Sequence, residues 1–103
     1  MASKELSSLT TTSTYVSSPG EILKEEFLDP LGISQYRLAK AIGKPQSAVS
    51  DIVHGKRAIT PDMAYLIGTA LGTTPDFWLR LQTTYQLKTL NQADLPEVEV
   101  LVK

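Results

Sequence analysis

Apolar residues recur at helical spacing within residues 34–57, and their pattern predicts two short amphipathic helices. In the first, Leu38, Ala39 and Ile42 lie on one side, and a glycine follows them. The second is predicted over residues 45–54, because its leading proline suits the first turn of a helix. At about 3.6 residues per turn, its apolar residues share one arc, and the opposite arc consists of Gln46, Ser47, Ser50, Asp51 and His54. We therefore expect two helices joined by a tight turn, the second with a polar face open to another molecule.

Three further helices are predicted around this central pair. The segment 18–21, Ser-Pro-Gly-Glu, is a capping-box pattern with proline at the first helical position, and predicts a helix that runs to about Leu28 and ends at Asp29-Pro30. Residues 60–62 and 74–76 both read Thr-Pro-Asp, which places a hydroxyl cap before a proline and an acid near the helix start. They predict a fourth helix that stops at Gly72 and a fifth that extends to about Thr89. The fold class is therefore all-α, with a five-helix domain over residues 18–90.

The two ends of the chain differ from this domain. Residues 1–17 are rich in Ser and Thr and bury too little to offset their ordering entropy, so a flexible N-terminal arm is predicted. In the tail, residues 91–103, acidic and β-branched residues alternate from Glu97 to Val102, which indicates a β-strand. A lone strand needs a partner edge. Three edges are considered, namely the same strand of a second chain, the arm near Tyr15, and another protein; an unstructured end is the alternative.

Composition excludes several classes of protein. The chain has no cysteine and a single histidine, so it has neither a disulfide framework nor the residues for a thiolate or histidine-rich metal site. No signal peptide is recognisable, and no apolar run is long enough to span a bilayer. We expect a cytoplasmic protein that does not enter membranes. Motifs for phosphate loops, nucleophile elbows and zinc proteases are missing, so neither an enzyme nor a bound cofactor is expected.

The charge distribution favours DNA as a partner although the whole chain carries a net charge of −1. Residues 34–57 have a net charge of +4 and the remainder −5. A basic patch on an acidic body suits the phosphate backbone, although an ordinary solvated surface is the simpler explanation. Glutamine and serine side chains suit base edges, and flanking cations suit phosphates. From charge and position, the predicted phosphate contacts include Lys44 and Arg57.

Two aromatic residues of the fifth helix are candidates for a dimer interface. Phe77 is expected in the core. For Trp78 and Tyr85, core packing and a surface for a second protomer are both open, because a domain of this size has a limited interior and operator-binding modules are usually dimers.

The central stretch resembles the helix-turn-helix of the Xre or lambda/434-repressor class through Gln35, Leu38, Ala39, Ile42, Gly43, Gln46, Val49, Ile52, Gly55 and Lys56. The wider chain is more specific. It is similar to HigA-type antitoxins, the VapI-like branch, through SPGEIL at residues 18–23, EEFLDPLGIS at 25–34 and RAITPDMAYLIGTALGTTPDFWLRLQTTYQL at 57–87. The resemblance covers about residues 18–90, and the arm and the tail lie outside it.

This resemblance implies an antitoxin that neutralises a small basic toxin similar to RelE, a ribonuclease, and that represses its own operon as a homodimer on double-stranded operator DNA. It implies base reading by Gln46, Ser47 and Ser50, and backbone contacts by Gln35 and Lys56. One alternative is a stand-alone Xre-class repressor without a toxin. Another is an interaction module that has lost its DNA-binding role.

Overall fold

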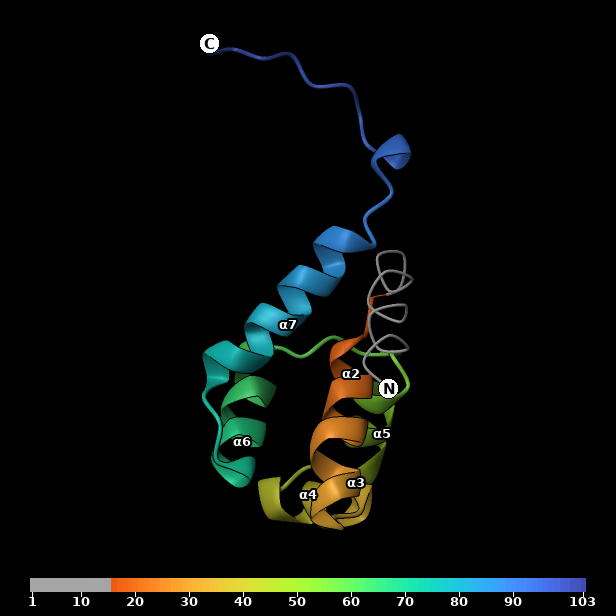
Figure 1. Cartoon of the computed structure of the whole chain (residues 1–103), viewed down its shortest axis with the longest axis vertical. Helices are drawn as coiled ribbons and strands as arrows, with labels where there is room; N and C mark the ends of the chain where they lie inside the picture. The colour runs from red at the N-terminus through yellow and green to blue at the C-terminus, as the bar shows by residue number, and fades with distance from the viewer. Residues whose placement is uncertain (1–15) are drawn as a thin grey trace, which may run out of the picture.

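The computed structural model describes residues 16–103, so most of the predicted arm lies outside the described residues (Figure 1). An N-terminal helix turns from α into π geometry and back, and four more helices follow it. With the continuous segment α2–η2–α3 counted as one helix, five helices make up the domain. The described residues contain no strand, which confirms the all-α prediction. The elements in order are α2 (Pro19–Ile22), η2 (Leu23–Leu28), α3 (Asp29–Leu31), α4 (Gln35–Ile42), α5 (Gln46–Val53), α6 (Pro61–Leu71), α7 (Pro75–Lys88) and a short 3-10 turn, η3 (Gln92–Asp94).

The N-terminal helix starts as predicted and ends later than predicted. Ser18 and Glu21 form the capping box, with each side chain accepting a hydrogen bond from the other residue's backbone N–H, at 2.9 and 3.2 Å. The helix does not stop at Asp29-Pro30. Its middle turns are π-helical, the N–H of Asp29 donates to the carbonyl of Lys24 five residues back, and the chain continues to Leu31. The wider turn accommodates Pro30, which lacks an N–H and would crowd a regular helix.

The core lies between the N-terminal helix, the α4–α5 pair and the α6–α7 pair. Its fully buried large side chains come from all of these elements, namely Leu23, Leu28, Leu38, Val49, Ile52, Ile67 and Trp78. Gly20 allows α2 to approach the end of α5 closely, since a Cβ there would overlap the carbonyl oxygen of Ile52. The N-terminal helix therefore rests directly on the C-terminal turn of α5.

The structure corrects the expected roles of two neighbouring aromatic residues. Trp78 is completely buried, and its indole Nε1–H donates to Thr73 Oγ1 at 2.7 Å. Phe77, expected in the core, is 38% exposed and packs edge-on against Phe27 and Trp78. Because its side chain has no surface left for a second protomer, Trp78 is a core residue, and placing it at a dimer interface is wrong.

The predicted C-terminal strand does not form in the single chain. Beyond η3, residues 95–103 are neither helical nor paired, and they project away from the domain past the end of α7 (Figure 1). The physical reason is that no sheet edge is available within the described residues to accept the strand's hydrogen bonds. Its apolar side chains are correspondingly exposed, from 78% at Val98 to 85% at Leu101.

Candidate nucleic-acid interface

Local backbone geometry sets the angle between α4 and α5. Ser34 caps α4 by accepting a hydrogen bond from the N–H of Arg37 at 3.0 Å. Gly43 ends that helix in the left-handed region, at φ 71°, which lets the chain turn at once. Pro45 then stands immediately before α5 in an extended conformation, as its N-cap, so the helix starts one residue later than predicted. As a cap, proline offers no side-chain acceptor. The N–H of Ala48 donates to the Pro45 carbonyl, and the N–H groups of Gln46 and Ser47 are left for an outside anion.

The two faces of α5 are divided as the sequence pattern predicts. Ala48, Val49, Ile52 and Val53 are buried. On the opposite side Gln46 and Ser47 are exposed, and Ser50 and Asp51 are half-buried. The predicted polar arc is therefore confirmed as the outer surface of this helix, and its N-terminal end is the most accessible part.

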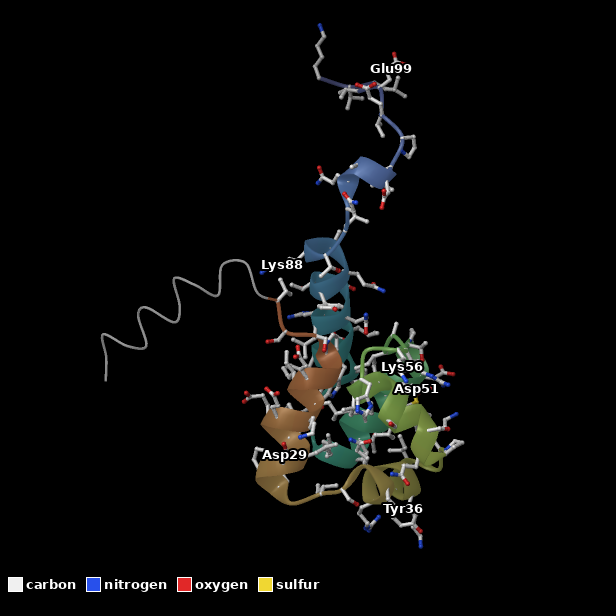
Figure 2. All side chains as sticks on the ribbon, turned by 90° about the vertical axis from the view of Figure 1, so that its right-hand side faces the viewer. Asp29, Tyr36, Asp51, Lys56, Lys88 and Glu99 are labelled. Atoms are coloured by element: carbon white, nitrogen blue, oxygen red, sulfur yellow. The ribbon has the colours of Figure 1, made fainter. Side chains whose placement is uncertain are left out.

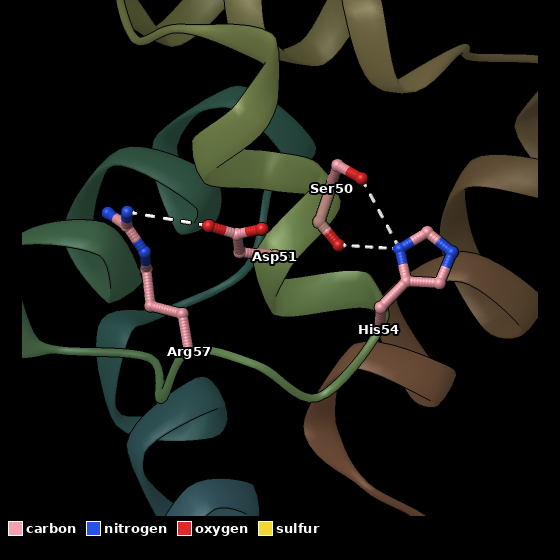
Figure 3. A network of polar contacts seen from close by, with 4 residues as sticks. All are labelled: Ser50, Asp51, His54 and Arg57. Atoms are coloured by element: carbon pink, nitrogen blue, oxygen red, sulfur yellow. Dashed lines mark hydrogen bonds and ion pairs between the residues drawn. The ribbon is translucent and has the colours of Figure 1, made fainter.

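A network of polar contacts stiffens the C-terminal end of α5 and the turn that follows. The carbonyl oxygen of Asp51 accepts hydrogen bonds from the N–H groups of Lys56 and Arg57, at 2.7 and 3.2 Å. The Asp51 carboxylate lies 3.6 Å from the Arg57 guanidinium (Figure 3). Figure 2 shows Asp51 and Lys56 on the same side of the molecule. The predicted phosphate contacts Lys56 and Arg57 are thus exposed and held beside the polar arc.

Ser50 has a neighbour that the sequence did not reveal. The Nδ1 atom of His54 lies 2.8 Å from the carbonyl oxygen of Ser50 and 3.3 Å from its hydroxyl (Figure 3). Since a carbonyl only accepts, this nitrogen carries the proton in the shorter contact. The interaction caps the end of α5, and it also places the imidazole against a predicted base-reading hydroxyl.

The remaining predicted residues lie in different places. Lys44 is exposed in the turn before α5, and Gln35 is half-buried at the first position of α4. Tyr85 is half-buried on α7, where it lines a groove with Phe77 and also smaller pockets that reach the C-terminal end of α5. Sequence reasoning did not select Tyr36, whose side chain is 57% exposed on α4 and which Figure 2 shows at the edge of the domain. Its position next to Gln35, on the side of α4 opposite the buried residues, could have marked it in the sequence as an exposed aromatic residue near the predicted interface.

Residues 16–103 contain no cluster of three or more His, Asp or Glu side chains able to hold a metal ion. Within the same residues, no helix combines the length and apolar character required to cross a membrane.

Two helices joined by a tight turn, the second presenting a polar face between exposed cations, define the helix-turn-helix class of DNA-binding proteins. A model of the helix-turn-helix family matches residues 23–78. Virulence-associated protein I of Dichelobacter nodosus is 39% identical over 84 residues, which cover 82% of this chain and 77% of that protein. Antitoxin HigA-1 of Vibrio cholerae is 43% identical over 70 residues, which cover 68% of this chain and 66% of that protein.

A solved structure points to the same family as these relatives. The Pseudomonas aeruginosa antitoxin HigA with the higBA promoter superposes with a TM-score of 0.76 at 39% identity, over 84% of this chain and 98% of that one. The chain belongs to the Xre-class helix-turn-helix family, in the branch of the HigA-type antitoxins and virulence-associated protein I.

Proposed function

We propose that this protein is an antitoxin that represses its own operon as a homodimer and neutralises a small basic ribonuclease toxin similar to RelE. It acts by binding and not by catalysis, in the cytoplasm. Each protomer inserts α5 into a major groove, and the two helices meet half-sites about 34 Å apart on one face of the duplex. The observation that carries this proposal is the exposed N-terminal end of α5, with Lys44 before it and Lys56 and Arg57 after it.

Within this proposal, the polar groups have distinct roles. Gln46 and Ser47 read base edges, because they are the most exposed polar side chains of α5. Ser50 joins them once its hydroxyl exchanges its contact with His54 for one with a base. Gln35, Lys44, Lys56 and Arg57 contact the backbone, which fixes orientation and supplies most of the sequence-independent affinity.

The DNA-binding part is tested by titrating the full chain against a duplex from the region upstream of its own gene and against a scrambled duplex of equal length. We expect the upstream duplex to bind more tightly by at least a factor of about 1,000 at physiological salt, with a complex of two protomers per operator by sedimentation. Equal affinity for the two duplexes would overturn the repressor assignment.

Toxin neutralisation is supported by the relative named antitoxin HigA-1 and is tested separately. The full chain is co-expressed with the product of the adjacent short reading frame, and the purified complex is weighed by mass spectrometry. We expect a stable complex and restored growth when the neighbouring gene alone arrests it. Operator binding without such a complex would identify a stand-alone Xre-class repressor.

A further inference from the structure

A groove with a volume of about 590 Å³ lies beside α7. Apolar side chains line it together with two exposed cations, Arg80 and Lys88, and one exposed acid, Asp76. It lies away from the polar face of α5, so the proposed DNA contacts do not use it. We call it the α7 groove and define it by Ile22, Phe77, Arg80, Leu81, Tyr85 and Lys88.

The tail beyond α7 carries apolar and acidic side chains that complement those of the α7 groove. In an extended segment successive side chains alternate between two sides, so Val98, Val100 and Val102 share one side, and Glu97 and Glu99 share the other with Leu101. All three valines are between 78% and 81% exposed. The valine row matches the apolar lining of the groove. The glutamates match Arg80 and Lys88, which outnumber the one acid there, Asp76.

The tail does not occupy the groove of its own chain. Figure 2 shows Lys88 on α7 and Glu99 far beyond the end of that helix, at the opposite end of the molecule from the domain body. Since the tail points away from the groove of its own chain, a tail that enters this groove would come from a second copy, and a two-fold dimer would exchange the two tails reciprocally. Eight extended residues, 95–102, span about 26 Å, and the 14 residues of α7 span about 21 Å, so one tail reaches along the whole groove.

We infer that the C-terminal tail of each protomer docks in the α7 groove of a second copy of this chain, valines on its apolar lining and glutamates at Arg80 and Lys88. This inference rests on the homodimer of the proposed function and names the segment that forms it. It also gives Tyr85, which lines the groove, contact with the second protomer.

The chain has no cysteine, so single cysteines report the contact cleanly. Thr84→Cys places a thiol at the groove, Val100→Cys places one on the tail, and Thr69→Cys places one on an exposed threonine of α6 as the control. Two full-length variants are mixed, one with a tag that changes its mass, and are oxidised mildly. We expect the Thr84–Val100 pair to give the dominant disulfide-linked dimer and the Thr69–Val100 pair to give little.

Three results would overturn the inference. A dominant link between two Val100→Cys chains would show that the tails pair with each other. A link within one chain in the double variant T84C/V100C, at a concentration where it is monomeric, would show that the tail folds back. Equal yields with Thr84 and Thr69 would show no defined site.

Charge reversal gives an independent measurement. R80E/K88E and E97K/E99K should each raise the dimer dissociation constant about tenfold in sedimentation equilibrium, and an equal mixture of the two should recover a heterodimer. No recovery in the mixture would contradict the pairing. Operator titration of the unmodified chain separates failure of the docking site from failure of the proposed function. Operator preference without the Thr84–Val100 link overturns only the docking site, whereas absence of operator preference overturns the proposed function.

Discussion

The Asp51 carboxylate lies 3.6 Å from the Arg57 guanidinium, while the backbone carbonyl of the same Asp51 accepts hydrogen bonds from the N–H groups of Lys56 and Arg57. One acidic residue on the polar face of α5 therefore holds the turn that carries two predicted phosphate contacts. It also competes with phosphate for one of them. The carbonyl contacts do not depend on the side chain, so the two effects can be separated by substitution.

Asp51→Asn should tighten binding to operator and scrambled duplex alike, by up to about fivefold, because an exposed ion pair is worth at most about 1 kcal/mol. The substitution removes a negative charge from the DNA-facing side and frees Arg57 for phosphate. Fluorescence anisotropy at several salt concentrations measures the affinity for each duplex. The matched control is Glu25→Gln, because Glu25 is an exposed acid on η2. Weaker binding to the operator alone would mean that Asp51 reads a base.

Gln46→Ala should cost about 1–3 kcal/mol on the operator and leave affinity for scrambled duplex unchanged, because a bidentate glutamine contact discriminates at one base pair. Competition gel shifts with duplexes altered at single positions would locate that base pair. Operator preference unaffected by the substitution would refute the role of Gln46 in base reading.

Local signals explain what the sequence predicted well. The caps at Ser18, Thr60 and Thr74 are satisfied within three residues, so the starts of three helices follow from short stretches of chain. The outer position of Gln46 and Ser47 likewise follows from helical periodicity alone.

Features set by distant contacts were not predictable in the same way. Phe77 and Trp78 are adjacent on one helix, and which of them is buried depends on how α7 packs against the rest of the domain, including Phe27 of the N-terminal helix. Asp29-Pro30 is a usual stop signal, and the sequence did not reveal that a π-helical turn carries the helix past it. The Asp51–Arg57 ion pair depends on how the chain turns after α5, and a strand signal cannot form a strand without a partner.

Lys56→Ala should weaken binding to all sequences equally and lower the magnitude of the salt-dependence slope by about 1, because one phosphate contact releases about one counterion. The slope of affinity against salt concentration measures this directly. Lys24→Ala is the control, since Lys24 is an exposed lysine that pairs with Asp29 at 2.9 Å, and Figure 2 shows Asp29 on the side of the domain opposite Lys56. A slope change at Lys24 as large as that at Lys56 would show a diffuse charge effect instead of a contact.

Trp78→Phe should lower the free energy of unfolding by about 1–3 kcal/mol, because it removes a buried hydrogen bond to Thr73 and some core volume. The dimer dissociation constant should stay unchanged, since the indole has no exposed surface. Tyr85→Ala should show the reverse, with weaker dimers and little effect on the unfolding of the monomer. Urea denaturation at monomeric concentration and sedimentation equilibrium separate the two effects. Weaker dimers in Trp78→Phe at unchanged stability would contradict the core assignment.

Gly20→Ala should impair both stability and operator binding, because the new methyl group would overlap the carbonyl oxygen of Ile52 and lie 2.8 Å from that of Val53. The N-terminal helix and the end of α5 must then separate, at a cost of about 1–3 kcal/mol or more. Gly72→Ala is the matched control, because its φ of 77° strains an alanine while nothing lies within 4 Å of the added atom. Both variants should lose stability in urea, but only Gly20→Ala should lose operator affinity under conditions where the chain is fully folded. Equal operator affinity in the two folded variants would show that the position of α5 does not depend on its contact with α2.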